Sequence, residues 1–212
     1  PDADAEVLAL DDSLLSLART AIDRLNQRHP MAGGPRFLVL HRRRLWNPSE
    51  GRWMGWERKR GKLHELNRLL RGATDTSFVE AAVPQGVRYV VTLDADTRLP
   101  RDTLRALIGK MAHPLNHARL DPALARVVEG YGILQPRVTP ALPVGAEGSA
   151  YQRIHSAPGG IEPYAAAISD VYQDLFAEGS FTGKGIYDVD AFEAAMAGRV
   201  PENTMLSHDL FE

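Results

Sequence analysis

The most informative segment of the chain is Arg88-Tyr89-Val90-Val91-Thr92-Leu93-Asp94-Ala95-Asp96-Thr97. Its apolar part, Tyr89–Leu93, is short and rich in β-branched residues, which predicts a buried strand. The run ends at two carboxylates, Asp94 and Asp96, and a helical pattern follows from Pro100. Open α/β sheets bind ligands at this kind of strand-to-helix edge, so the sequence predicts a ligand site there.

Asp94 and Asp96 are spaced so that they can act together. In an extended segment, side chains two positions apart point the same way. Two such carboxylates can share one Mg²⁺ or Mn²⁺ ion and the phosphates that the ion carries. The alternative is structural, because Asp is common in turns and at helix starts, and short motifs also arise by chance.

The composition suits one α/β domain with a sizeable core. The 212 residues are 44% hydrophobic and 25% charged, and the net charge of −2 gives no indication of nucleic-acid binding. The chain has no cysteine, which excludes disulfides and cysteine-based metal sites. No apolar run approaches the roughly 18 residues of a membrane-spanning helix. The chain starts at Pro1 and not at Met, which predicts a piece of a longer protein.

Strand and helix patterns alternate along the chain. Pro1–Asp12 is expected to be a loose lead-in, with Ser13 capping the first helix. Strands and extended segments are expected at 37–40, 130–138 and 178–187, and helices at 13–29, 57–71 and 188–197. This order predicts a mainly parallel sheet flanked by helices.

Four cations, Arg58, Lys59, Arg60 and Lys62, open the second helix pattern. Such a cluster suits a polyanion such as a diphosphate. It is also typical of a solvated basic helix start. Cations at a helix N-terminus oppose the helix dipole, so local stability does not explain them, which favours a functional interpretation.

Several common motifs fail on inspection. Gly179–Gly185 resembles a P-loop, but one residue is missing between its glycines and Gly185 stands where Ser or Thr should bind magnesium. His64-Glu65 lacks the second histidine of a zinc-protease helix, since Arg68 occupies that position. A glycosidase that uses two carboxylates stays open, and its candidates are Asp94, Asp96, Glu178, Asp188, Asp190, Asp209 and Glu212.

Longer runs resemble a known family. The segments 89–97, 179–192 and 206–212 resemble the donor-site blocks of processive GT-A glycosyltransferases. The runs 53–67, 128–140 and 179–190 are similar to the glycosyltransferase domain of bacterial cyclic β-1,2-glucan synthases, of glycosyltransferase family 84. The resemblance extends from about residue 13 to the end. It implies a GT-A-like fold with a mainly parallel, Rossmann-like sheet.

The resemblance also implies a reaction and a divalent cation. UDP-glucose would donate glucose, with inversion, to the 2-hydroxyl of a growing β-1,2-glucan acceptor. Asp94 and Asp96 match the family's D-x-D motif, in which Asp96 would hold Mg²⁺ or Mn²⁺ while Asp94 contacts the donor or shares the metal. Asp209 matches the catalytic base, which takes the acceptor proton.

Further residues are carried over from the same family. Donor-binding positions are Lys62, Arg60, Gly183 and Gly185, and acceptor-side positions are Gln135 and Arg137. The glycines would let the backbone approach the sugar.

On this interpretation residues 1–212 form a single, truncated GT-A-like domain of a larger inner-membrane enzyme. Its active face would be cytoplasmic, and only absent parts of the parent protein would contact the membrane. Some donor-side strands and the family's Gln-x-x-Arg-Trp block are absent from the sequence. The alternatives are a non-catalytic fragment that binds nucleotide-sugar or glucan, and the glycosidase described above.

Overall fold

The computed structural model describes residues 2–80, 82–95, 97–136, 149–151, 175–176, 181, 183–199 and 201. These residues belong to two compact units. The first contains the residues up to Arg88, together with the described residues from Met196 onward. The second contains the described residues from Tyr89 to Ala195. The prediction of one glycosyltransferase domain over residues 1–212 stays a prediction.

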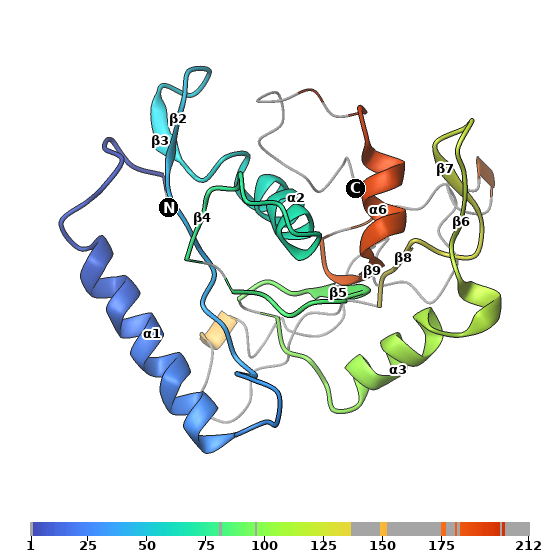
Figure 1. Ribbon diagram of the computed structural model, residues 1–212, viewed down its shortest axis with the longest axis horizontal. Helices are drawn as coiled ribbons and strands as arrows, with labels where there is room; N and C mark the ends of the chain where they lie inside the picture. Colours follow the sequence, from blue (N-terminus) through green and yellow to red (C-terminus); the bar gives the residue numbers. More distant parts are fainter. Residues whose placement is uncertain are drawn as a thin grey trace. The chain divides into compact units, whose positions relative to one another are not determined.

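The described part of the first unit combines two helices with two small two-stranded sheets (Figure 1). Its elements in order are α1 (Asp11–Arg28), β1 (His41–Arg42), β2 (Leu45–Asn47), β3 (Arg52–Met54), α2 (Arg58–Leu70) and β4 (Phe78–Val79). β1 pairs antiparallel with β4, and β2 pairs antiparallel with β3. α2 ends as predicted, because Gly72 takes the left-handed conformation (φ +88°) that favours glycine.

Three expectations for this unit are wrong. Phe37–Leu40 is not a strand, and the first strand begins only at His41. The Asn26 side-chain amide accepts a hydrogen bond from the Phe37 N–H and donates one to the Phe37 carbonyl, both at 2.9 Å, so these backbone groups are not available for strand pairing. α1 begins at Asp11, so Ser13 is not its cap. The lead-in is held in place, since Ala3 exchanges two backbone hydrogen bonds with Trp53 and Arg44 forms a two-point ion pair with Asp11.

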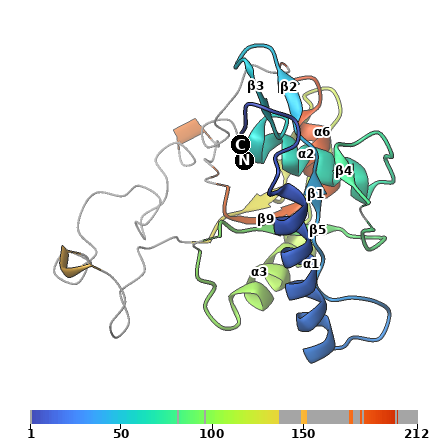
Figure 2. The same ribbon diagram turned by 90° about the vertical axis from the view of Figure 1, so that its left-hand side faces the viewer.

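The second unit is organised around a three-stranded sheet in the order β5-β9-β8. The strands are β5 (Tyr89–Thr92), β9 (Gly185–Asp188) and β8 (Ile133–Leu134). β5 confirms the predicted strand. α3 (Thr103–Met111) lies along the sheet, and α6 (Val189–Met196) follows directly from β9, as Figures 1 and 2 show. The short helix η1 (Pro114–Asn116) leads into the hairpin of β6 (Arg119–Asp121) and β7 (Arg126–Glu129).

The core of this unit lies between α3 and the sheet. Leu107 and Met111 of α3 pack with Ile186 of β9, and all three are buried. Tyr89, Val91 and Leu134 cover this cluster from the neighbouring strands. Burying these apolar side chains fixes α3 against the sheet.

The fold class is mixed α/β, as predicted, but strand direction differs from the expectation. Every pairing between named strands in the described residues is antiparallel, and the one parallel contact among them is the isolated bridge between His117 and Tyr131. Alternation of strands and helices along the chain does not determine which strands become neighbours, so it could not fix their direction. In the described part of the chain, no helix combines the length and apolarity needed to cross a bilayer.

Candidate functional site

Asp94 sits in a turn at the end of β5. Its N–H donates to the Thr97 hydroxyl at 3.2 Å, and the Thr97 N–H donates to the Asp94 carbonyl at 3.0 Å. These two bonds close the turn and hold the Asp94 backbone at the edge of the sheet. Asp96 lies outside the described residues, so the pairing of the two carboxylates stays a prediction.

The Asp94 carboxylate forms an ion pair with Lys184. Lys184 Nζ lies 2.8 Å from Asp94 Oδ2, and the side chains are 26% and 35% exposed. The antiparallel register explains the contact, since Thr92 pairs with Gly185 and brings the end of β5 beside the beginning of β9. Sequence reasoning did not assign Lys184 to the site, although Lys184 lies in the rejected P-loop pattern and in the run 179–190 that carries the family resemblance. No spacing rule identifies a contact between residues so far apart in the chain.

The donor set suits a hard divalent cation only in part. Carboxylate oxygen is a ligand that Mg²⁺ and Mn²⁺ prefer. Within the described ranges, however, no group of three or more His, Cys, Asp or Glu side chains could hold a metal. A cation at Asp94 would therefore need further oxygens, and the phosphates of a nucleotide are suitable ligands of this kind.

Gly185 has a structural reason to be glycine. A Cβ at this position would lie 2.5 Å from the Leu134 carbonyl oxygen, 2.9 Å from the Phe181 ring and 3.2 Å from Gln135 Cα. The protein's own atoms thus fill the space beside Gly185. Gly183 takes a left-handed conformation (φ +71°), which glycine adopts without strain. The roles of both glycines in donor binding remain predictions.

Of the two residues predicted on the acceptor side, Gln135 lies in the described part of the chain. Gln135 is half-buried directly after β8, where its Cα approaches Gly185. Arg137 and the predicted base Asp209 lie outside the described residues. The structure thus brings Asp94, Lys184, Gly185 and Gln135 into the same unit around β9.

The basic segment belongs to the first unit and differs from a simple solvated helix start. Arg60 forms an ion pair with Glu57, which is 2% exposed, and its guanidinium lies 5.5 Å from the centre of the Trp56 ring. Arg58 pairs with Asp2 at 2.8 Å. Lys62 is exposed on α2. Arg58 and Arg60 are therefore engaged by acidic side chains of the protein itself.

A buried polar network holds the start of α2. Arg42 donates to the Glu65 carboxylate at 2.8 Å and to the carbonyls of Trp56 and Arg58 at 3.1 and 2.7 Å. Glu65 also accepts from the Ser77 N–H and hydroxyl. Burial acts to raise the pKa of Glu65, but the hydrogen bonds from Ser77 and Arg42 outweigh it and keep the pKa below its usual value. This network was not identified from the sequence, because its residues come from β1, α2 and the segment just before β4.

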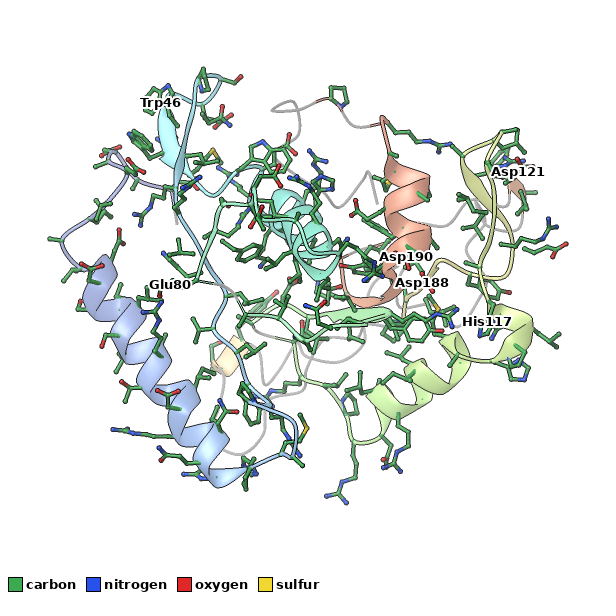
Figure 3. All side chains as sticks on the ribbon, viewed as in Figure 1. Trp46, Glu80, His117, Asp121, Asp188 and Asp190 are labelled. Carbon is green, nitrogen blue, oxygen red and sulfur yellow. The ribbon has the colours of Figure 1, made fainter. Side chains whose placement is uncertain are left out.

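Two of the carboxylates considered for a glycosidase lie at the start of α6 (Figure 3). Asp188 is buried, and its Oδ1 accepts from the backbone N–H groups of Asp190 and Ala191, both at 3.1 Å. This is the contact of a helix N-cap, which gives Asp188 a structural role. Glu178, Asp209 and Glu212 lie outside the described residues.

Comparison with known proteins identifies a relative of the chain. No protein-family model matches the chain. The chain is 56% identical, over its whole length, to part of the cyclic β-(1,2)-glucan synthase NdvB of Rhizobium meliloti (strain 1021). It spans 8% of the length of that relative.

Proposed function

We propose that this chain is part of a glucosyltransferase that transfers glucose from UDP-glucose to the 2-hydroxyl of a growing β-1,2-glucan. The observation that carries the proposal is the 56% identity, over the entire chain, to a cyclic β-(1,2)-glucan synthase. Identity at this level in an alignment that spans the whole chain supports a role in glucan synthesis. The donor, the inverting course and the GT-A arrangement of the parent sheet are parts of the proposal.

The position of Asp94 supports a donor site at the end of β5. Asp94 and Asp96 would provide the carboxylates for a divalent cation, and the donor diphosphate would complete the ligand set. When bound, the cation supplies Lewis-acid stabilisation of the UDP leaving group. Lys62 and Arg60, with Gly183 and Gly185, are proposed to surround the donor. The exposure of Lys62 agrees with this role, and Arg60 forms an ion pair with Glu57.

The proposed transfer is a single displacement. The acceptor 2-hydroxyl oxygen forms a bond to the anomeric carbon as the bond from that carbon to UDP breaks, and the configuration inverts. Asp209 accepts the hydroxyl proton as the general base, which requires it to lie within hydrogen-bond reach of that oxygen. Gln135 and Arg137 are proposed to hold the acceptor. The parent enzyme would carry out this reaction at the cytoplasmic face of the bacterial inner membrane.

Calorimetric titration with UDP-glucose tests the proposal. It is performed with and without Mn²⁺, on the full-length parent protein and on this chain, each as wild type and as Asp96→Ala. We expect binding that requires Mn²⁺ and is lost in Asp96→Ala. The matched control is Asp190→Ala, which removes a carboxylate from α6 and should leave binding unchanged.

Two results would contradict the proposal. If the parent protein binds UDP-glucose without a metal ion, and Asp96→Ala does not change that binding, the D-x-D assignment is wrong. If a parent protein carrying Asp209→Asn synthesises β-1,2-glucan at the normal rate, Asp209 is not the general base. Donor binding without turnover, in a parent with all these residues intact, would favour a non-catalytic binding role.

A further inference from the structure

Lys184 lies at a position that neither the sequence motifs nor the relative's name assigns to any role. It stands between two glycines, Gly183 and Gly185, immediately before β9. Gly185 is held by close contact with β8, and the pairing of Thr92 with Gly185 fixes β9 against β5. The backbone of Lys184 is therefore placed beside the end of β5, while its long side chain keeps rotatable bonds that allow it to move.

The strength of the ion pair suits an exchangeable contact. Lys184 Nζ and Asp94 Oδ2 are 2.8 Å apart, but both side chains keep about a quarter to a third of their surface exposed. Ion pairs with this degree of exposure contribute on the order of 1 kcal/mol or less, because water competes for both partners. A divalent cation interacts with a carboxylate more strongly than one ammonium does, so it can displace Lys184.

The displaced ammonium would have a new partner close by. A donor whose diphosphate binds the cation at Asp94 brings negative oxygens to the same edge of the sheet. Lys presents three donors on a flexible stem and binds phosphate well as a point charge. Moving from the carboxylate to the diphosphate would keep the Lys184 charge compensated in both states.

We propose that Lys184 is the exchangeable counter-ion of Asp94. It neutralises the carboxylate before the donor binds, and it contacts the donor diphosphate once a divalent cation has taken Asp94. The inference rests on the proposed function, because it assumes that Asp94 shares the cation. In the donor-free protein Lys184 competes with the metal, whereas in the donor complex it supports binding.

The two opposite effects give the proposal a specific test. Mn²⁺ binding alone is measured by electron paramagnetic resonance, and UDP binding at saturating Mn²⁺ by calorimetry, both on the full-length parent protein. In Lys184→Met we expect Mn²⁺ alone to bind roughly threefold to tenfold more tightly, since its competitor is gone. UDP should bind about tenfold or more weakly, because a charge-assisted hydrogen bond is lost.

Two control variants separate this role from a structural one. Lys184→Arg keeps the positive charge and should restore both affinities to near wild-type values. Lys110→Met removes a cation from the last turn of α3 and should change neither affinity beyond about twofold, because exposed distant charges are screened. A Lys that only stabilises the fold would lower the melting temperature without tightening Mn²⁺ binding.

The outcomes distinguish the two proposals. Mn²⁺ binding that requires Asp94 but is unchanged or weakened in Lys184→Met would overturn the counter-ion role alone. Mn²⁺ binding that neither Asp94→Asn nor Asp96→Ala affects would overturn the metal site of the proposed function, and the role of Lys184 would be rejected with it. Tighter Mn²⁺ binding with weaker UDP binding in Lys184→Met supports the exchange.

Discussion

Gly61 lies directly against the backbone of Trp56: a Cβ at position 61 would stand 2.0 Å from the Trp56 carbonyl oxygen. The approach is this close because Glu57 and Arg58 both take left-handed conformations, with φ of 43° and 49°. Such conformations are strained for residues with a side chain, and Arg42 holds this turn by binding the carbonyls of Trp56 and Arg58. Gly61 therefore allows the Trp56 carbonyl to lie against the first turns of α2.

Gly61→Ala should destabilise the protein by about 3 kcal/mol or more, because a backbone oxygen cannot yield to the new methyl group as a flexible side chain could. Thermal unfolding followed by circular dichroism measures the loss. The matched control is Gly109→Ala, in the interior of α3, where a Cβ would meet nothing within 4 Å. That variant should be neutral or more stable by about 0.5–1 kcal/mol. Equal stabilities of the two variants would contradict the Gly61 contact.

The network around Glu65 predicts acid sensitivity. The pKa of Glu65 is lower in the folded protein than its unperturbed value of 4.5, so its contribution is fully present above pH 4.5. That contribution is lost as the pH falls from 4.5 through the folded pKa. Glu65→Gln should therefore reduce stability at pH 7 and flatten the dependence of stability on pH below 4.5. Urea unfolding at a series of pH values measures both effects.

Removing Arg42, the ion-pair partner of Glu65, should lower the stability of the fold more than removing a partner from an exposed ion pair. The Arg42 and Glu65 side chains are only 9% and 7% exposed, so Arg42→Ala leaves a buried carboxylate without its counter-charge. We expect Arg42→Ala to lower the free energy of unfolding by about 3 kcal/mol. Arg119→Ala is the control, since its pair with Glu129 is more than 60% exposed on both sides and should contribute little. A loss in Arg42→Ala no larger than in the control would contradict a buried network.

Gly185→Ala should disrupt the β5-β9-β8 sheet. Its methyl group would lie 2.5 Å from the Leu134 carbonyl oxygen, which β8 cannot move without breaking its pairing with β9. Gly132→Ala is the control, because its nearest contacts are a Val127 methyl at 3.4 Å and Ala191 Cβ at 3.7 Å. Amide hydrogen exchange on β9 should rise strongly in the first variant and little in the second.

Asp188 should behave as a helix cap and not as a catalytic acid. Asp188→Ala removes the acceptor for two N–H groups of α6 and should cost about 1 kcal/mol. Asp188→Asn keeps a capping oxygen and should retain most of that stability. Glucan synthesis by the parent should be nearly normal in the Asn variant, whereas the loss of all activity with intact folding would revive a catalytic role.

Local patterns in the amino-acid sequence predicted most of the individual helices and strands correctly. The apolar β-branched run gave the strand at Tyr89, the 3.6-residue periodicity gave α2 and α3, and Gly72 and Gly198 ended helices in left-handed conformations as expected. These features depend on neighbouring residues, so they can be read along the chain. The same local reasoning placed a strand at Phe37–Leu40, where the distant side chain of Asn26 took the backbone groups that a strand would use.

Contacts between residues far apart in the chain became known from the three-dimensional fold. The antiparallel register of β5 and β9 placed Lys184 beside Asp94, and the packing of three elements placed Arg42 and Ser77 around Glu65. Sequence patterns report on periods of two to four residues, whereas these contacts join residues 12 to 90 positions apart. The sequence thus named Asp94 as a candidate because of its local context, but the partner of Asp94 depends on strand pairing, which is set by burial across the whole unit.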